Sequence, residues 1–514
     1  MERRTFLAAA AAAGAARSAS VIAAPRRPQV RTSLGPVRGT SEAGLHVFRG
    51  IRYGGAERFQ APRAPAASRD GVEAVAFGPS APQRGDRYKP QSEDCLFLNV
   101  WTPEARLGAK RPVMVYIHGG AYSSGSVVDP LNDGRHLASR GDVVVVTINH
   151  RLNAFGYLYL ARLDPRFPDS GNAGQLDQML ALQWIRDNIA RFGGDPGRVL
   201  VFGQSGGGAK IATMMGMPAA QGLFHRAVTM SGQQVTASGP INATARAKAY
   251  LAALKASPAD LVRMPTAKLV DGLAAIDPIL GGGVYFGPVL DMKWLVRHPF
   301  WPNANPQSND ISMILGNTRD ETRAFIDPKG PKMVGLDWSN IAERMAPELR
   351  MDIHPEWVVS QYRGRFPDWS PERVFYAATT AGRSWPGQVI EADERARANT
   401  RTWVYQLDFQ SPVEPWRGAP HTLDIPLAFG TLDAEGSITG TGAAARALSG
   451  AIMDAFVAFA RTGDPNHRGL PAWPIYDLPD RASMIFDVNS RASNDPRRWE
   501  RELFARVPYI QPGT

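Results

Sequence analysis

Several short apolar runs without polar alternation occur along the first two thirds of the chain. Residues 112–117, 142–148 and 198–202 are rich in Val and Ile and lie between turn-forming residues. Continuous runs of this kind are typical of strands that are covered on both faces, as in a mostly parallel sheet. Residues 96–101 and 311–315 predict two further strands.

Helical spacing of apolar residues follows some of these runs. Residues 176–192 carry such a stripe and end at a Gly-Gly-Asp-Pro sequence, residues 208–217 predict a second helix, and residues 448–459 carry a third stripe. A strand, helix, strand order is what parallel neighbours require. We therefore expect an α/β fold: a large, mostly parallel, twisted sheet flanked by helices.

Two segments have a more mixed pattern. Residues 236–310 and 330–400 contain helical patches separated by Pro and Gly, most clearly at 243–256 and 357–363. We expect helical insertions there that form a lid or a substrate gorge over the sheet, within a single domain at 30–514.

The composition predicts a protein with a large core, since 44% of the residues are hydrophobic and 21% charged. The net charge of +10 suggests a nucleic-acid partner, but basic and acidic residues are interspersed and no nucleic-acid-binding motif is present. We expect no such partner. Cys95 is the only cysteine, and no Cys/His cluster has metal-ligand spacing, so we also expect no internal disulfide, no metal and no cofactor. The oligomeric state stays open.

The first 24 residues resemble an export signal. Arg3-Arg4 precedes an Ala-rich, mildly apolar stretch that ends near residue 16, and small residues follow at 21–24. The stretch is shorter than the roughly 20 apolar residues that span a bilayer. We predict a twin-arginine signal peptide at 1–24, no membrane span, and export to the periplasm or out of the cell.

The sequence GQSGG at 203–207 fits the G-x-S-x-G pattern, in which a serine occupies a tight turn between a strand and a helix. The predicted strand before it and the predicted helix after it supply this context. Ser205 is therefore the candidate nucleophile.

A serine hydroxyl needs a base, and the base needs an orienting carboxylate. In folds with this turn the chain order is serine, acid, histidine. His225 and His298 follow the serine too closely, which leaves His354, His421 and His467. His467 lies in a turn typical of solvated surface and His354 in a mixed segment, whereas His421 lies between a loop and an apolar run.

The candidate acid follows the predicted strand at 311–315, where Asp320 and Glu321 are adjacent. The residues alone do not separate the two carboxylates. Another predicted strand ends in the small-residue loop HGGA at 118–121, whose backbone N–H groups could bind a developing oxyanion. One such donor typically contributes about 3 to 4 kcal/mol to transition-state stabilisation.

At this point the sequence resembles the type-B carboxylesterases, the carboxylesterase and cholinesterase-like family of α/β-hydrolase fold. Besides the serine turn, the matching stretches are SEDCLFLNVW at 92–101, HGGAY at 118–122, NHRLNAFG at 149–156, GNAG at 171–174, FGGDP at 192–196 and FARTGDP at 459–465. The resemblance extends from about residue 30 to the C-terminus.

The resemblance implies that Ser205 is the nucleophile, that Glu321 rather than Asp320 is the acid, and that His421 is the base. It implies that Ser231 supports the acid. The implied oxyanion donors are the backbone N–H groups of Gly120, Ala121 and Gly206.

Three departures from the family pattern lie next to these residues. Gln204 stands where the family usually has Glu, Gly206 where it usually has Ala, and Thr422 where Gly commonly follows the histidine. Gln204 removes a negative charge beside the nucleophile, and residues 81–95 contain no Trp. A preference for quaternary ammonium substrates is therefore not expected.

The sequence thus predicts a serine carboxylic-ester hydrolase that acts on a small-molecule ester through an acyl-enzyme. An amidase or lactonase using the same triad is the alternative, and a non-catalytic cholinesterase-like binding module is a more distant one.

Overall fold

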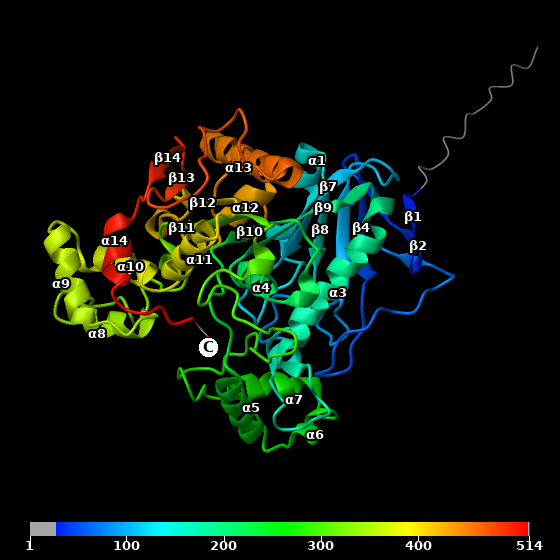
Figure 1. The fold of residues 1–514 in the computed structure, drawn as a ribbon, viewed down its shortest axis with the longest axis horizontal. Coiled ribbons are helices and arrows are strands. Elements are labelled where there is room, and N and C mark those ends of the chain that lie inside the picture. The colour runs from blue at the N-terminus through cyan, green and yellow to red at the C-terminus, as the bar shows by residue number, and fades with distance from the viewer. Residues whose placement is uncertain (1–26, 512, 514) are drawn as a thin grey trace, which may run out of the picture.

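The structure is a computed structural model that describes residues 27–511 and 513. Within these residues, an eleven-stranded sheet forms the centre of the molecule (Figure 1), with the strand order β14-β13-β12-β11-β10-β9-β7-β8-β6-β4-β3. The run from β8 to β13 is parallel, and the strands outside it are antiparallel to their neighbours. The predicted mostly parallel sheet is confirmed.

The strands of the main sheet are β3 (Thr40–Glu42), β4 (Leu45–Arg52), β6 (Phe97–Thr102), β7 (Arg111–Ile117), β8 (Val144–Ile148), β9 (Gly194–Gln204), β10 (Arg226–Met230), β11 (Ser312–Thr318), β12 (Thr402–Leu407), β13 (Ala482–Phe486) and β14 (Arg491–Asn494). A small sheet contains β1 (Gln29–Thr32), β2 (Gly35–Arg38) and β5 (Val72–Glu73).

The helices are α1 (Arg135–Gly141), α2 (Asn153–Tyr157), α3 (Ala173–Asn188), α4 (Gly206–Met214), α5 (Pro240–Leu254), α6 (Pro258–Leu261), α7 (Thr266–Asp271), α8 (Ile341–Met345), α9 (Pro355–Arg365), α10 (Pro371–Ala381), α11 (Trp385–Arg397), α12 (Asp424–Phe429), α13 (Ala443–Thr462) and α14 (Arg498–Phe504).

Helices cover both faces of the sheet. On one face α3, α4 and α11 complete a core with alternate side chains of the central strands, such as Val115 and Val201. On the other face α1, α12 and α13 pack against the intervening side chains, such as Met114 and Phe202. Because both faces are buried, the central strands need apolar residues at every position. This is the pattern that predicted them.

Helix α13 is long and apolar enough to cross a membrane by length and composition alone. Its apolar residues lie against the sheet and α12, and 61% of its apolar window is buried within the protein. This burial accounts for its composition as that of a core helix.

The two expected insertions differ. Residues 330–400 form α8 to α11, which build a separate apolar cluster with α14 at one end of the molecule (Figure 1). Residues 236–310 are helical in α5 to α7 but mostly irregular after residue 274. The predicted signal at 1–24 lies outside the described residues.

Candidate active site

Ser205 lies on a strained turn between β9 and α4. Its φ and ψ of 55° and −125° are sparsely populated by residues with a side chain. Neighbouring backbone maintains this conformation, since the Ser205 N–H donates to Met230 O at 2.7 Å and the Ser205 carbonyl accepts from Ala209 N at 3.0 Å. The expected strand-to-helix turn is present, and it presents a partly exposed serine at the carboxyl end of the sheet.

Close backbone packing explains the glycines around this serine. A Cβ at Gly207 would lie 2.0 Å from the carbonyl oxygen of Ile117, and a Cβ at Gly203 would lie 2.6 Å from the backbone of Gly207. Both contacts are far inside van der Waals distance. Only glycine therefore allows α4 to approach the end of β7 this closely.

His421 and Glu321 form a buried hydrogen-bonded pair. His421 follows the loop after β12, Glu321 follows β11, and Nδ1 of the imidazole contacts Oε2 of the carboxylate. The other carboxylate oxygen accepts hydrogen bonds from Ser231 Oγ at 2.5 Å and from the backbone N–H of Thr318 at 2.9 Å. Burial by itself raises the pKa of Glu321, but the adjacent imidazole and these donors outweigh it and lower the pKa. The carboxylate is thus held ionised against His421.

The Asp320 side chain contacts Ala419 rather than His421. Its carboxylate accepts a hydrogen bond from Ala419 N at 2.9 Å, and its own N–H donates to Ala419 O at 2.9 Å. Asp320 therefore ties the loop that carries His421 to the turn that carries Glu321. The two carboxylates that the residues alone left equivalent have different positions, and Glu321 is the one that contacts the imidazole.

The other candidate histidines lie away from this pair. His354 is exposed and bonds to Glu356, and His467 contacts the carbonyl of Ala451 at 3.1 Å. Of the three histidines that the sequence left open, His421 is the one the structure brings to a candidate acid.

The other ring nitrogen of His421, Nε2, also has a hydrogen-bond partner. The side-chain amide of Gln204 donates to His421 Nε2 at 3.1 Å. The Ser205 hydroxyl makes no hydrogen bond to any residue in the described part of the chain. For Ser205 to transfer a proton to His421, the imidazole must therefore exchange Gln204 for the serine. Such tightening on substrate binding is common in ligand-free active sites.

The loop after β7 faces the start of α4. Gly120 and Ala121 have positive φ values of 90° and 52°. The N–H groups of Gly120, Ala121 and Gly206 donate to no group within residues 27–511 and 513. A Cβ at Gly206 would lie 2.1 Å from the carbonyl oxygen of Ala121, so this glycine permits the close approach. The three implied oxyanion donors thus lie on two adjacent segments next to the serine.

Lys210 supports this loop, although no motif indicated it. Its Nζ is fully buried and donates to the carbonyl oxygens of Ala121 at 2.7 Å and His118 at 3.2 Å. No carboxylate in the described part of the chain pairs with it, and burial lowers the pKa of the ammonium to about 7. The sequence did contain a signal for this residue, because Lys210 is the one charged residue in the apolar stretch 206–217.

A cavity of about 260 Å³ opens beside the loop after β7, and Ser205, His421 and Lys210 are not among the residues that line it. Its walls include Gly119, Gly120, Gln204 and Thr422, together with Tyr88 of the loop before β6. None of the described residues that line it belongs to 236–310 or 330–400. A lid function for those segments stays a prediction.

Comparison with known proteins gives a consistent result. The sequence profile described as the carboxylesterase family matches residues 26–503. The chain is 34% identical to para-nitrobenzyl esterase of Bacillus subtilis (strain 168), over 92% of this chain and 97% of that protein. It is also 34% identical to phenmedipham hydrolase of Pseudarthrobacter oxydans, over 92% and 98%. Among solved structures, carboxylesterase EST55 of Geobacillus stearothermophilus has a TM-score of 0.83 at 34% identity, and the match covers 93% of this chain and all of that one. The expected α/β-hydrolase fold is confirmed.

Proposed function

The chain belongs to the carboxylesterase family and is a carboxylic ester hydrolase, and from this premise we propose that Ser205, His421 and Glu321 carry out the reaction through an acyl-enzyme. The observation that carries the proposal is the buried His421–Glu321 pair beside a serine on a strained strand-to-helix turn. These three groups have the roles of nucleophile, base and orienting acid that serine hydrolysis requires.

In the first step His421 Nε2 accepts the hydroxyl proton of Ser205 while Oγ forms a bond to the ester carbonyl carbon. The tetrahedral intermediate then collapses, the bond to the alcohol oxygen breaks, and His421 returns the proton to the leaving alcohol. In the second step water, deprotonated by the same imidazole, attacks the acyl carbon. The bond from that carbon to Ser205 Oγ then breaks, His421 returns the proton to Oγ, and the carboxylic acid leaves. Glu321 stabilises the imidazolium that forms in each step.

The N–H groups of Gly120, Ala121 and Gly206 bind the oxyanion in both steps. Lys210 is a positioning residue for this loop, because its ammonium holds the carbonyl groups of His118 and Ala121 on the side of the loop that faces α4. The amides that donate to the substrate belong to the same short segment. Fixing the carbonyl groups therefore limits the orientations that the donors adopt before substrate arrives.

The substrate is a small-molecule ester without a quaternary ammonium group. Gln204 is neutral, and the 260 Å³ cavity beside it accommodates one side of an ester of modest size. The name of the Bacillus subtilis relative refers to para-nitrobenzyl esters, which have an uncharged aromatic alcohol. Esters of this class are the first substrates to test.

The test is hydrolysis of p-nitrophenyl esters of rising acyl length by the wild type, Ser205→Ala and the exposed control Ser339→Ala. We expect Ser205→Ala to lose on the order of 10⁴-fold or more in kcat/KM and the control to retain wild-type rates. Equal activity of Ser205→Ala and wild type would refute the nucleophile assignment. An anilide with the same acyl group, cleaved faster than the ester, would favour the amidase alternative.

A further inference from the structure

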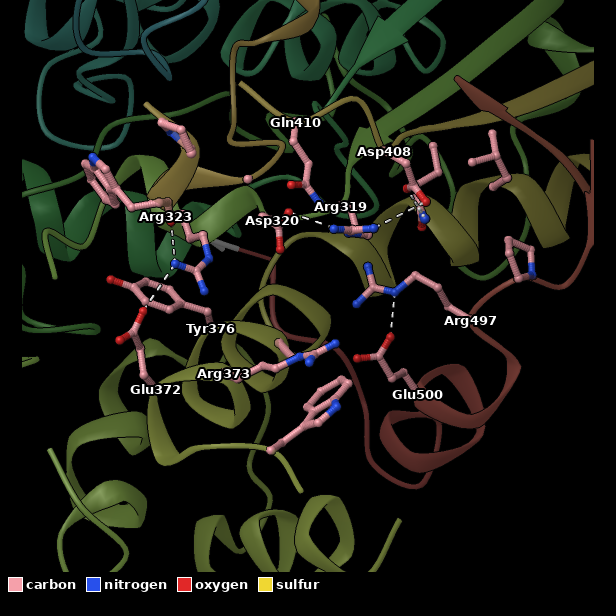
Figure 2. A pocket seen from close by; sticks show the side chains of 18 of the residues that line it. Arg319, Asp320, Arg323, Glu372, Arg373, Tyr376, Asp408, Gln410, Arg497 and Glu500 are labelled. Atoms are coloured by element: carbon pink, nitrogen blue, oxygen red, sulfur yellow. Dashed lines mark hydrogen bonds and ion pairs between the residues drawn. The ribbon is translucent and has the colours of Figure 1, made fainter. Parts of the chain in front are cut away.

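A second and larger cavity, of about 860 Å³, lies behind the turn that carries the catalytic acid. It is lined by Asp320 and Gly418, by α10, and by the segments around β12, β14 and α14 (Figure 2). Ser205, Glu321 and His421 are not among its lining residues. The cavity also shares no lining residue with the 260 Å³ cavity beside Gln204. It is therefore distinct from the proposed active site, although it shares a wall with the loops that hold it.

Arginine dominates the charge of this cavity. Five arginines (Arg319, Arg323, Arg373, Arg491 and Arg497) and four carboxylates (Asp320, Glu372, Asp408 and Glu500) line it. Arg323 pairs with Glu372 at 3.4 Å and Arg497 with Glu500 at 2.6 Å. Arg373 and Arg491 have no ion pair within the described part of the chain, so the lining retains unpaired positive charge.

Aromatic rings hold some of these arginines in place. The Arg373 guanidinium lies 4.2 Å from the ring centroid of Trp369, whose other neighbour, Phe366, stacks on it at 4.0 Å. Arg497 lies in the same way over Trp385 at 4.3 Å. Stacking uses the flat face of a guanidinium and leaves the N–H groups at its edge free to donate.

One guanidinium, that of Arg497, has an N–H group without a hydrogen-bond partner in the described structure. Nη1 of Arg497 is buried and makes no hydrogen bond in the described structure, and the whole side chain is only 9% exposed. Figure 2 shows that Arg319, Arg373 and Arg497 turn their guanidinium groups toward the same space. A buried donor without an acceptor is unfavourable, so a small movement of the Arg497 side chain toward a ligand that supplies an acceptor is favoured.

We propose that this cavity binds a small organic monocarboxylate, with its carboxylate held by Arg373 and Arg497. A guanidinium fork matches the two oxygens of a carboxylate. The four acidic residues in the lining disfavour ligands with several negative charges, so the site is suited to a single carboxylate rather than a phosphate dianion. Trp416 in the wall is 39% exposed and offers apolar surface to the body of the ligand.

The position of the site links it to catalysis. Asp320 lies in its wall and also bonds to Ala419, two residues before His421. If the proposed function holds, the ligand belongs to the chemical class that the enzyme releases, since ester hydrolysis yields a carboxylate. Binding itself does not depend on that assignment.

Isothermal titration calorimetry with benzoate tests the proposal without any activity measurement. We expect one benzoate to bind per chain and Arg373→Gln to weaken binding about 10-fold or more, the effect of losing one charged hydrogen bond. The matched control is Arg363→Gln, because Arg363 is also exposed on a helix and stacks on a tryptophan, Trp338, at 4.5 Å, but lies outside the cavity. We expect the control to bind as the wild type does.

The exposed Arg491 gives a second variant, and Arg491→Gln is expected to weaken benzoate binding by a smaller factor. Absence of binding, or equal binding by wild type and Arg373→Gln, would overturn the site. Inorganic phosphate that binds more tightly than benzoate in the same titration would overturn the assignment to a monocarboxylate. Since activity plays no part in these titrations, a failure here is separate from a failure of the triad assignment.

Discussion

Replacing Lys210 with methionine tests whether a buried ammonium orients the oxyanion loop. Methionine fills a similar volume and keeps α4 apolar, but it cannot donate to Ala121 O and His118 O. Lys210 lines neither cavity described above, so the change removes no contact with substrate in the cavity beside Ser205.

The expected effect on catalysis follows from the loop geometry. Loss of one oxyanion donor costs about 100- to 1000-fold in kcat. Lys210 acts on these donors through the loop and not on the substrate itself. We therefore expect kcat of Lys210→Met to fall about 10- to 100-fold while KM changes little.

The expected effect on stability has a defined pH dependence. Burial lowers the pKa of Lys210 from 10.5 in the unfolded chain to about 7, so the unfolded state binds more protons between these values. Wild-type stability therefore rises with pH above 7, by about 1.4 kcal/mol per unit, and this contribution is lost as pH falls through 7. Since half of the folded molecules still hold the proton at pH 7, the wild type should gain about 2 kcal/mol relative to Lys210→Met between pH 7 and pH 9.

Other groups near Lys210 do not titrate in this range. Burial, and the charge of Lys210, lower the pKa of His118 to about 3 and that of His150 well below its usual value. Burial raises the pKa of Tyr122, whose ring lies 5.5 Å from the ammonium. A stability change between pH 7 and pH 9 that disappears in Lys210→Met therefore reports on the lysine.

The assay combines steady-state hydrolysis of a p-nitrophenyl ester with urea unfolding at pH 7 and pH 9. Lys268→Met, an exposed lysine on α7, is the control and should match the wild type in both. Wild-type kcat in Lys210→Met would refute the positioning role. Parallel stability curves for variant and wild type would refute the depressed pKa.

Three further changes have distinct expected results. Burial raises the pKa of Glu391 from 4.5 to about 8, so the folded state holds the proton more tightly and the stability of the wild type falls as pH rises from 5 to 8. In urea unfolding, Glu391→Gln should gain about 1.4 kcal/mol of stability over the wild type for each unit of that rise. A difference between the two proteins that does not change with pH would contradict this. Ser231→Ala removes a 2.5 Å hydrogen bond to Glu321, the proposed catalytic acid, and should lower kcat about 10-fold, whereas an unchanged kcat would show that the bond is dispensable. Gly206→Ala restores the usual family residue but places a Cβ 2.1 Å from the carbonyl oxygen of Ala121, so kcat should fall with little change in KM; higher activity would mean that the loop adapts.

The sequence alone determined the central architecture. The Val- and Ile-rich runs at 112–117 and 198–202 became β7 and β9, and the stripe at 176–192 became α3 and the turn after it. These features are local consequences of burial, because a strand covered on both faces needs apolar residues throughout and an amphipathic helix needs them at helical spacing. The serine turn was predictable for the same reason, since its glycines are required by close packing within a few residues.

The family resemblance predicted more of the candidate site than spacing and periodicity did. Periodicity and spacing left Asp320 and Glu321 equivalent and left three histidines open, and the matching motifs selected Glu321 and His421. The structure places Glu321 against His421 and turns Asp320 to Ala419. Neighbouring residues on one turn point in different directions, and the direction of each depends on what packs around the turn.

Only the tertiary structure showed three other features. Gln204 occupies the nitrogen of His421 that would accept the serine proton, Lys210 holds the oxyanion loop, and the arginines of the larger cavity come from segments between residues 319 and 497. The lone charge of Lys210 in the apolar stretch 206–217 is the one local signal among them, and it does not indicate what the ammonium binds, because each feature depends on groups that are distant in the chain and adjacent in space. Local pattern records which residues are buried, whereas the partner that each buried polar group finds is decided by how the strands and loops pack together.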